Sequence, residues 1–72
     1  MPYREHRRKV GLTIRAYRKQ AGLTQEQLSE KAELSPKYFG EVERGVVNIS
    51  LDAMVRIAKA MKITVHDLTR GL

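Results

Sequence analysis

Four segments of the chain repeat one arrangement: an apolar residue, then Ser or Thr, then a second apolar residue four positions after the hydroxyl. They begin at Leu23-Thr24, Leu34-Ser35, Ile49-Ser50 and Ile63-Thr64. In this arrangement the hydroxyl accepts a hydrogen bond from an otherwise unpaired backbone N–H of the first helical turn, and the two apolar side chains pack across that turn. Each segment therefore predicts the start of a helix.

An earlier helix is indicated by apolar residues spaced by four, three and four, so that they share one helical face. These residues are Val10, Ile14, Tyr17 and Ala21. Gly22 follows this face directly, and glycines at 45 and 71 follow later helices in the same way, as is common at helix ends. The pattern predicts five helices, at residues 6–21, 25–32, 36–43, 51–61 and 65–69, and no strand.

The second and third of these helices are joined very closely. Three residues separate the segments 25–32 and 36–43, which suits a sharp turn of about 90–120°. We therefore predict a helix-turn-helix over residues 24–45, within one all-α domain of residues 1–72. The apolar residues expected to face inward in this motif are Leu28, Ala32, Phe39 and Val42, with Ser29 as the small side chain where the helices cross.

Composition limits how this small domain can be stabilised and what chemistry it can perform. The 72 residues include no Cys and only two distant His, so no disulfide and no structural zinc site is expected. No nucleophile lies beside a base, and no glycine-rich phosphate loop follows a strand, so we predict neither an enzyme nor a cofactor nor a small-molecule ligand. Further core residues are expected to be Ile14, Tyr17, Leu51, Met54, Ile57, Ala58 and Met61.

The chain carries a formal net charge of +6, from fourteen Lys and Arg against eight Asp and Glu. This excess favours a polyanionic partner, with nucleic acid first among the candidates. Half of the basic residues precede residue 20, and this segment is either an arm that follows phosphate groups or a solvated helix face. These residues are Arg4, Arg7, Arg8, Lys9, Arg15, Arg18 and Lys19.

No apolar run is long enough for a membrane span, and the first residues lack the apolar centre of a signal peptide. A cytoplasmic protein without a membrane partner is therefore expected. A chain that begins at Met1 and ends just after Gly71 fits either a complete protein, which would then lack a ligand-sensing domain, or a piece of a longer protein.

The predicted motif resembles a known family. The Gly-Leu-Thr-Gln start at residues 22–25 and the Glu-Arg-Gly end at residues 43–45 resemble the Xre family of phage repressors and Cro proteins. The likeness continues through residues 48–51 and 57–63 and covers roughly residues 10–69. Restriction-modification controller proteins form a short branch of this family, and the chain is similar to them as well.

This resemblance implies that the third helix enters the major groove of double-stranded DNA and that a homodimer binds a palindromic operator. It further implies that Arg18 and Glu43 pair across the first and third helices; both would otherwise be plain surface charges. The residues that the resemblance assigns to the DNA backbone are Arg18, Thr24, Gln25, Arg44 and Asn48, with Val46 and Val47 in the same loop. Gln25 could instead be an ordinary solvated residue.

Five residues at the start and on the outer face of the third helix are candidates for base contacts: Ser35, Pro36, Lys37, Tyr38 and Glu41. A lysine can donate to guanine O6 and N7, and a glutamate can accept from cytosine N4. The alternatives are a phosphate contact for Lys37, a solubilising charge for Glu41, and packing of Tyr38 over a sugar or over the core.

Two positions depart from what a helix-turn-helix would prefer. Glu33 occupies the turn position where this family usually has Gly, so either Glu33 has a positive φ and is strained or the turn is built differently. Gly40 makes its helix about 1 kcal/mol less stable than Ala would; close approach of DNA or of a neighbouring backbone would explain it, and the alternative is a glycine that is merely tolerated.

The sequence favours a transcription regulator, repressor or controller, over a rival of another class. The rival is a protein-interaction module such as an antitoxin, which can use the same fold. For the expected dimer, the fifth helix and the tail offer an interface through Val65, Leu68 and Leu72.

Overall fold

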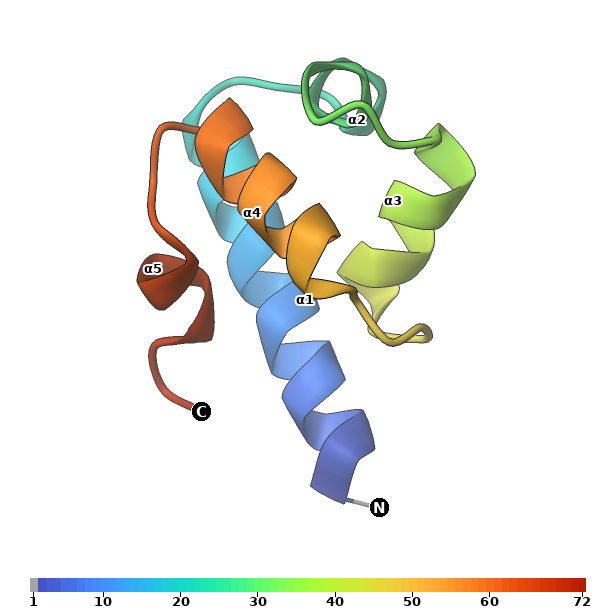
Figure 1. Ribbon diagram of the computed structural model, residues 1–72, viewed down its shortest axis with the longest axis vertical. Helices are drawn as coiled ribbons and strands as arrows, with labels where there is room; N and C mark the ends of the chain where they lie inside the picture. Colours follow the sequence, from blue (N-terminus) through green and yellow to red (C-terminus); the bar gives the residue numbers. More distant parts are fainter. Residues whose placement is uncertain (1) are drawn as a thin grey trace.

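The computed structural model describes residues 2–72; of the expected domain 1–72, Met1 lies outside the described residues. These residues form five helices and no strand: α1 (Pro2–Gln20), α2 (Gln25–Lys31), α3 (Pro36–Arg44), α4 (Leu51–Ala60) and α5 (Val65–Thr69) (Figure 1). The predicted all-α fold and its five helices are thus confirmed. The largest difference is at the start of α1, which begins four residues before the expected residue 6.

Hydroxyl caps start the four shorter helices, as the repeated sequence pattern predicts. Thr24, Ser35, Ser50 and Thr64 each accept a hydrogen bond from the backbone N–H three residues later. In α2 the Gln27 side chain also accepts from the backbone N–H of Thr24 at 2.8 Å, which completes the expected capping box. In each of these helices, a side chain at the helix start therefore satisfies part of the unpaired backbone N–H groups of the first turn.

In α5 the second half of the cap is a carboxylate. The Asp67 side chain accepts from the backbone N–H of Thr64 at 2.9 Å, and this hydrogen bond, with that to the Thr64 hydroxyl, lowers the pKa of Asp67. A carboxyl with a lowered pKa stabilises the fold above its ordinary pKa and loses this effect as the pH falls through the lowered value. The start of α5 therefore weakens only in acid.

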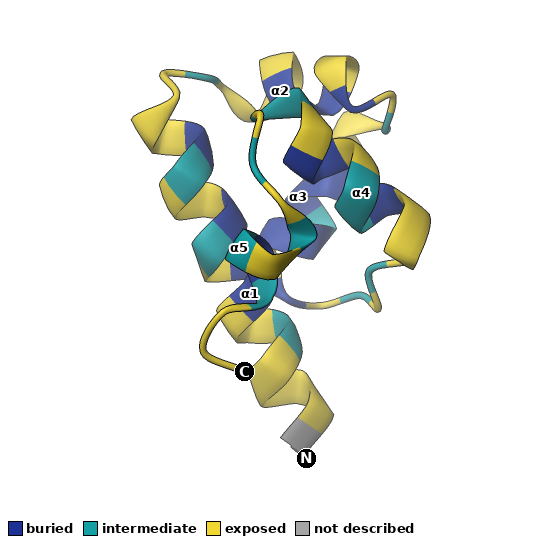
Figure 2. Cartoon of the chain, turned by 60° about the vertical axis from the view of Figure 1, so that its left-hand side comes forward, coloured by how far each residue is buried: buried dark blue, intermediate teal, exposed yellow. Residues whose placement is uncertain are grey.

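Residues from all five helices form the core: α3 packs on α1 and α2, α4 packs on α2 and α5, and α5 also packs on α1. Phe39, Ile14, Leu28, Ile57 and Leu68 are its largest fully buried side chains. The four inward residues expected in the helix-turn-helix are all buried, and Ser29 is buried with them. Figure 2 shows this distribution, with the first turns of α1 and the tail exposed.

Three apolar residues lie elsewhere than expected. Leu51, assigned to the core from the sequence, is 69% exposed, because it is the first residue of α4 and lies off the buried stripe of that helix. Ala21 is exposed because α1 ends before it. Leu68, expected at a dimer interface, is buried in the core instead, so only Val65 and Leu72 of that group remain partly accessible.

Within residues 2–72, no helix is long and apolar enough to cross a membrane.

The first half of α1 packs directly on the end of α3 through backbone. A Cβ on Gly11 would lie 2.6 Å from the carbonyl oxygen of Val42 and closer still to that of Glu43. A Cβ on Gly45, which ends α3 with φ +72°, would lie 2.7 Å from the Cα of Arg8. Two glycines therefore allow α1 and α3 to approach more closely than side chains would permit.

The turn between α2 and α3 contains a left-handed residue, Glu33, which decides between the two alternatives that the sequence left open for this turn. Its φ is 58°, and its carbonyl oxygen accepts a hydrogen bond from Nη1 of Arg56 at 3.3 Å. The left-handed conformation costs a residue with a Cβ about 1 kcal/mol. The turn therefore keeps helix-turn-helix geometry at a cost that glycine would avoid.

We expect Glu33→Gly to raise the free energy of unfolding by about 1 kcal/mol, since the strain is removed while the backbone carbonyl remains. Urea denaturation followed by circular dichroism measures this change. The matched control is Glu30→Gly on the exposed side of α2, which should lower stability by about 1 kcal/mol. A Glu33→Gly variant less stable than the parent would contradict the assigned strain.

Candidate nucleic-acid interface

The leading end of α3 is open to solvent. Ser35 caps this helix with its hydroxyl, which accepts from the backbone N–H of Tyr38 at 3.1 Å. Pro36 follows as the first helical residue, where it needs no N–H donor. Ser35, Pro36 and Lys37 are exposed, and Glu41, one turn after Lys37, is half-buried. The structure therefore places a lysine and a glutamate on one accessible side of α3.

Tyr38 is half-buried and turned towards α4. Its ring packs against the core cluster, and its hydroxyl oxygen accepts a hydrogen bond from the backbone N–H of Ser50 at 3.3 Å. Of the alternatives considered for this residue, the structure favours packing over the core. Tyr38 therefore connects the start of α4 to α3. It is less exposed than Lys37, the neighbouring candidate for a base contact.

A buried ion pair connects α1 to α3. Nε of Arg18 donates to Oε2 of Glu43 at 2.6 Å, and Nη2 donates to Oε1 at 3.2 Å. Nη1 of Arg18 donates to the carbonyl oxygen of Leu23 at 2.9 Å. The side chains are only 10% and 3% exposed. All three nitrogens of this guanidinium thus donate hydrogen bonds inside the protein, and the expected phosphate contact of Arg18 stays a prediction.

Gln25 joins the same network from the start of α2. Its Nε2 donates to Oε1 of Glu43 at 2.8 Å, so one carboxylate holds residues from α1 and α2 against α3. The side chain of Gln25 is nevertheless exposed. The hydrogen bond fixes its direction, and the neighbouring Thr24 is fixed by its capping box. A rigid, solvent-facing polar corner therefore lies beside α3.

Arg44 and Asn48 lie at the other end of α3 and are exposed. Nη1 of Arg44 lies 3.5 Å from the position of a Cβ on Gly40, so this arginine folds back along α3. Within residues 2–72, and apart from the neighbouring residues and backbone of α3 itself, the next atom is Oε1 of Gln25 at 4.0 Å. The protein interior therefore does not require glycine at residue 40. In the adjoining loop Val46 is exposed and Val47 is half-buried.

The structure thus brings Arg18, Gln25 and Glu43 together and leaves Lys37 exposed on the helix that they hold. Sequence reasoning missed the participation of Gln25 in the buried network, because a lone glutamine carries no spacing signal. It also missed the close packing at Gly11. A glycine in the middle of a predicted helix was the available signal for that contact, since it lowers helix stability.

A short helix with a free leading end, set by a sharp turn on a second helix and fixed to a scaffold helix, defines a helix-turn-helix protein. The comparisons agree. The model of the helix-turn-helix family matches residues 14–68. The chain belongs to this family, in its Xre type, and the resemblance inferred from the sequence is confirmed.

Known relatives include phage repressors and restriction-modification controllers. The chain is 46% identical over 59 residues to the immunity repressor protein of Bacillus phage phi105, covering 82% of this chain and 41% of the repressor. Over the first curated relatives, the chain spans between 41% and 66% of their length.

Solved structures show the same fold. The restriction-modification controller protein C.AhdI from Aeromonas hydrophila superposes with a TM-score of 0.83 at 38% identity, covering 85% of this chain and 92% of the other. SinR, a master regulator for biofilm formation solved in complex with DNA, superposes with a TM-score of 0.79 at 30% identity, covering 82% and 95%.

Proposed function

We propose that this protein is a sequence-specific DNA-binding transcription regulator, a repressor or controller that acts in the cytoplasm and reads the major groove with α3. The observation that carries the proposal is the exposed start of α3, held by the buried contacts of Glu43 to Arg18 and Gln25. A recognition helix must keep its direction to discriminate bases, and these contacts supply that rigidity. The net charge of +6 and the family membership support the same function.

Binding as a homodimer to a palindromic operator is part of this proposal. One recognition helix reads few base pairs, whereas a two-fold dimer reads two half-sites about 34 Å apart. The exposed Leu72 and the half-buried Val65, at the end of the chain and the start of α5, remain the candidate contacts between protomers. Sedimentation of the saturated complex measures the number of protein chains bound to each duplex. A single chain per selected duplex would contradict the homodimer.

Lys37 is the residue proposed to read a base. It lies in the opening turn of α3, the part of a recognition helix that contacts base edges, and its ammonium group can donate to guanine. We expect Lys37→Ala to weaken binding to the preferred site by about 1–3 kcal/mol and to relax the preference at one base pair in each half-site. Titration of the preferred duplex and of its single-base variants measures both effects.

The base preference and the salt dependence of the variant distinguish a base contact of Lys37 from a phosphate contact. If Lys37 contacts phosphate, affinity falls equally for every sequence and the dependence of log affinity on log salt becomes shallower by about one for each subunit. An unchanged base preference would therefore remove Lys37 from the specificity residues. Lys59→Ala, at an exposed position late in α4, is the matched control and should leave the preference unchanged.

A further inference from the structure

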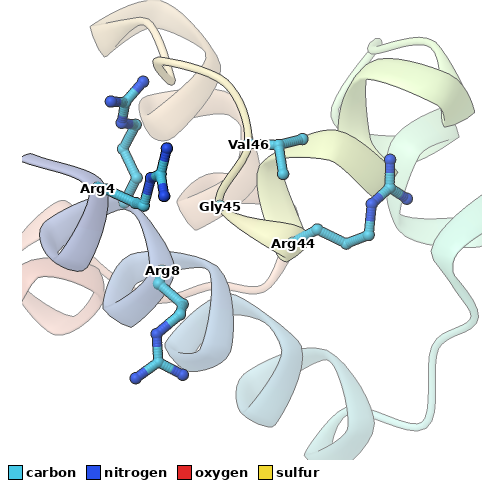
Figure 3. A pocket seen from close by; sticks show the side chains of 6 residues that line it. Arg4, Arg8, Arg44, Gly45 and Val46 are labelled. Atoms are coloured by element: carbon cyan, nitrogen blue, oxygen red, sulfur yellow. The ribbon is translucent and has the colours of Figure 1, made fainter.

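A surface cavity of about 370 Å³ lies where the first turns of α1 pass the end of α3 (Figure 3). No carboxylate lines it, and its walls are formed by Arg4, Arg7, Arg8, Arg44, Gly45 and Val46. The family match begins only at residue 14, so three of the four arginines belong to a part of α1 that precedes the matched region. We call the four arginines the arginine surface.

The arginine surface has a fixed position relative to α3. Gly45 lies so close to the backbone of Arg8 that a Cβ there would approach its Cα to 2.7 Å, and Gly11 contacts the last turn of α3 in the same way. The first turns of α1 are therefore held at the end of α3 by backbone packing at two points. The basic segment is part of the folded domain, which argues against a free arm.

The positive charge of this surface is largely uncompensated. The side chains of Arg4 and Arg44 donate no hydrogen bond within residues 2–72, and Arg7 donates only Nε, at 3.3 Å to the carbonyl oxygen of Tyr3. Arg8 pairs with Glu5 at 3.1 Å, but both side chains are more than half exposed. Exposed pairs of this kind contribute little, so Arg8 can exchange Glu5 for another anion at small cost.

The arrangement of the arginines suits an extended anion. Arg8 and Arg44 extend to opposite sides of Gly45 (Figure 3), so the charges do not converge on one point. A small free anion is held by groups that converge on it, whereas a nucleic-acid backbone presents one charge after another along a line. The geometry therefore favours a chain of phosphodiesters over a single phosphate ion.

We propose that the arginine surface binds the phosphodiester backbone of the same duplex whose bases are read by the start of α3. This inference rests on the proposed function. The nine residues of α3 span about 13 Å at about 1.5 Å per residue, close to the major-groove width of about 12 Å. With the start of α3 in the groove, its end and the arginine surface lie beside the backbone that borders the groove.

The test compares two double variants that remove the same charge. Arg4→Gln/Arg7→Gln changes the arginine surface, and Lys59→Gln/Lys62→Gln changes exposed lysines outside it and outside the basic first segment. Affinity for the preferred duplex is measured at several salt concentrations. We expect the first variant to lose about five- to tenfold in affinity per lost contact at about 0.1 M salt, and its log–log salt slope to become shallower by about 0.9 per contact. The base preference should stay unchanged.

A second measurement locates the contact. Single methylphosphonate groups, which remove one backbone charge each, are placed at successive positions of the duplex. We expect one position in each half-site to weaken binding by the parent protein and to have no effect on binding by Arg4→Gln/Arg7→Gln. Thermal unfolding by circular dichroism checks that both double variants remain folded; all four substituted side chains lie on or near the surface.

Each other outcome overturns the proposal in a recognisable way. If the two double variants bind with equal affinity and slope, the arginine surface does not contact DNA, while selective binding by the parent leaves the proposed function intact. If the parent selects no DNA, both proposals fail. If titration with inorganic phosphate shifts the Gly45 amide signal in nuclear magnetic resonance spectra to a plateau, and no methylphosphonate position changes the affinity, the cavity binds a free anion instead.

Discussion

Replacing Gly11 by Ala is expected to destabilise the domain by about 3 kcal/mol or more. The new Cβ would lie 2.6 Å from the carbonyl oxygen of Val42 and nearer still to that of Glu43. Both are backbone atoms, so no side chain can turn away, and α1 must separate from α3. A domain of this size has little stability to lose. Urea denaturation monitored by circular dichroism measures the effect.

Gly40→Ala is the matched control, because Gly40 is also a buried glycine inside a helix. Its Cβ would meet the end of the Arg44 side chain at 3.5 Å and Oε1 of Gln25 at 4.0 Å, which are ordinary contact distances to side-chain atoms. Alanine favours helix by about 1 kcal/mol over glycine, so this variant should be as stable as the parent or more stable. Equal losses at the two positions would show that the close approach of α1 and α3 does not determine stability.

Glu43→Ala is expected to cost about 3–5 kcal/mol of stability, since it leaves the buried guanidinium of Arg18 without its counter-charge. Gln25 also loses its hydrogen-bond acceptor, so DNA affinity should fall beyond what loss of folded protein explains. Removing both partners together, as in Arg18→Met/Glu43→Leu, should recover much of the stability, because no unpaired charge remains.

A double-mutant cycle on unfolding free energies measures the coupling between Arg18 and Glu43. The control is the exposed pair of Glu5 and Arg8, for which Glu5→Ala should change stability by less than about 1 kcal/mol. Additive losses at Arg18 and Glu43 would contradict the role of the ion pair in holding α3.

Local signals explain why most of the fold could be predicted from the sequence. Each of α2 to α5 begins at a hydroxyl cap flanked by apolar residues, and such caps act within one turn. The start of α1 was missed because the interpretation relied on apolar periodicity, whereas its first turns carry mainly charged residues such as Arg4 and Arg7. Leu51 was misplaced for a related reason, since its apolar character does not show that it precedes the buried stripe of α4.

The candidate site could be predicted less completely, because its key contacts join residues distant in sequence. The resemblance placed Arg18 opposite Glu43, but only the folded chain shows that the same carboxylate also accepts from Gln25. The closeness of Gly45 to Arg8 likewise depends on how two helices cross. Lys37 and Glu41 could be chosen as candidates from helix periodicity alone, because the buried residues of α3 mark its inner face and these two residues lie off that face.

Selection of bound sequences from a pool of random DNA duplexes tests the central proposal most directly. We expect a single enriched motif with two-fold symmetry, whose half-sites lie about 34 Å apart, one turn of the double helix. Repeating the selection with Lys37→Ala should leave the symmetry and weaken the preference at one base pair of each half-site. A bound pool that stays random in sequence would contradict sequence-specific recognition by α3.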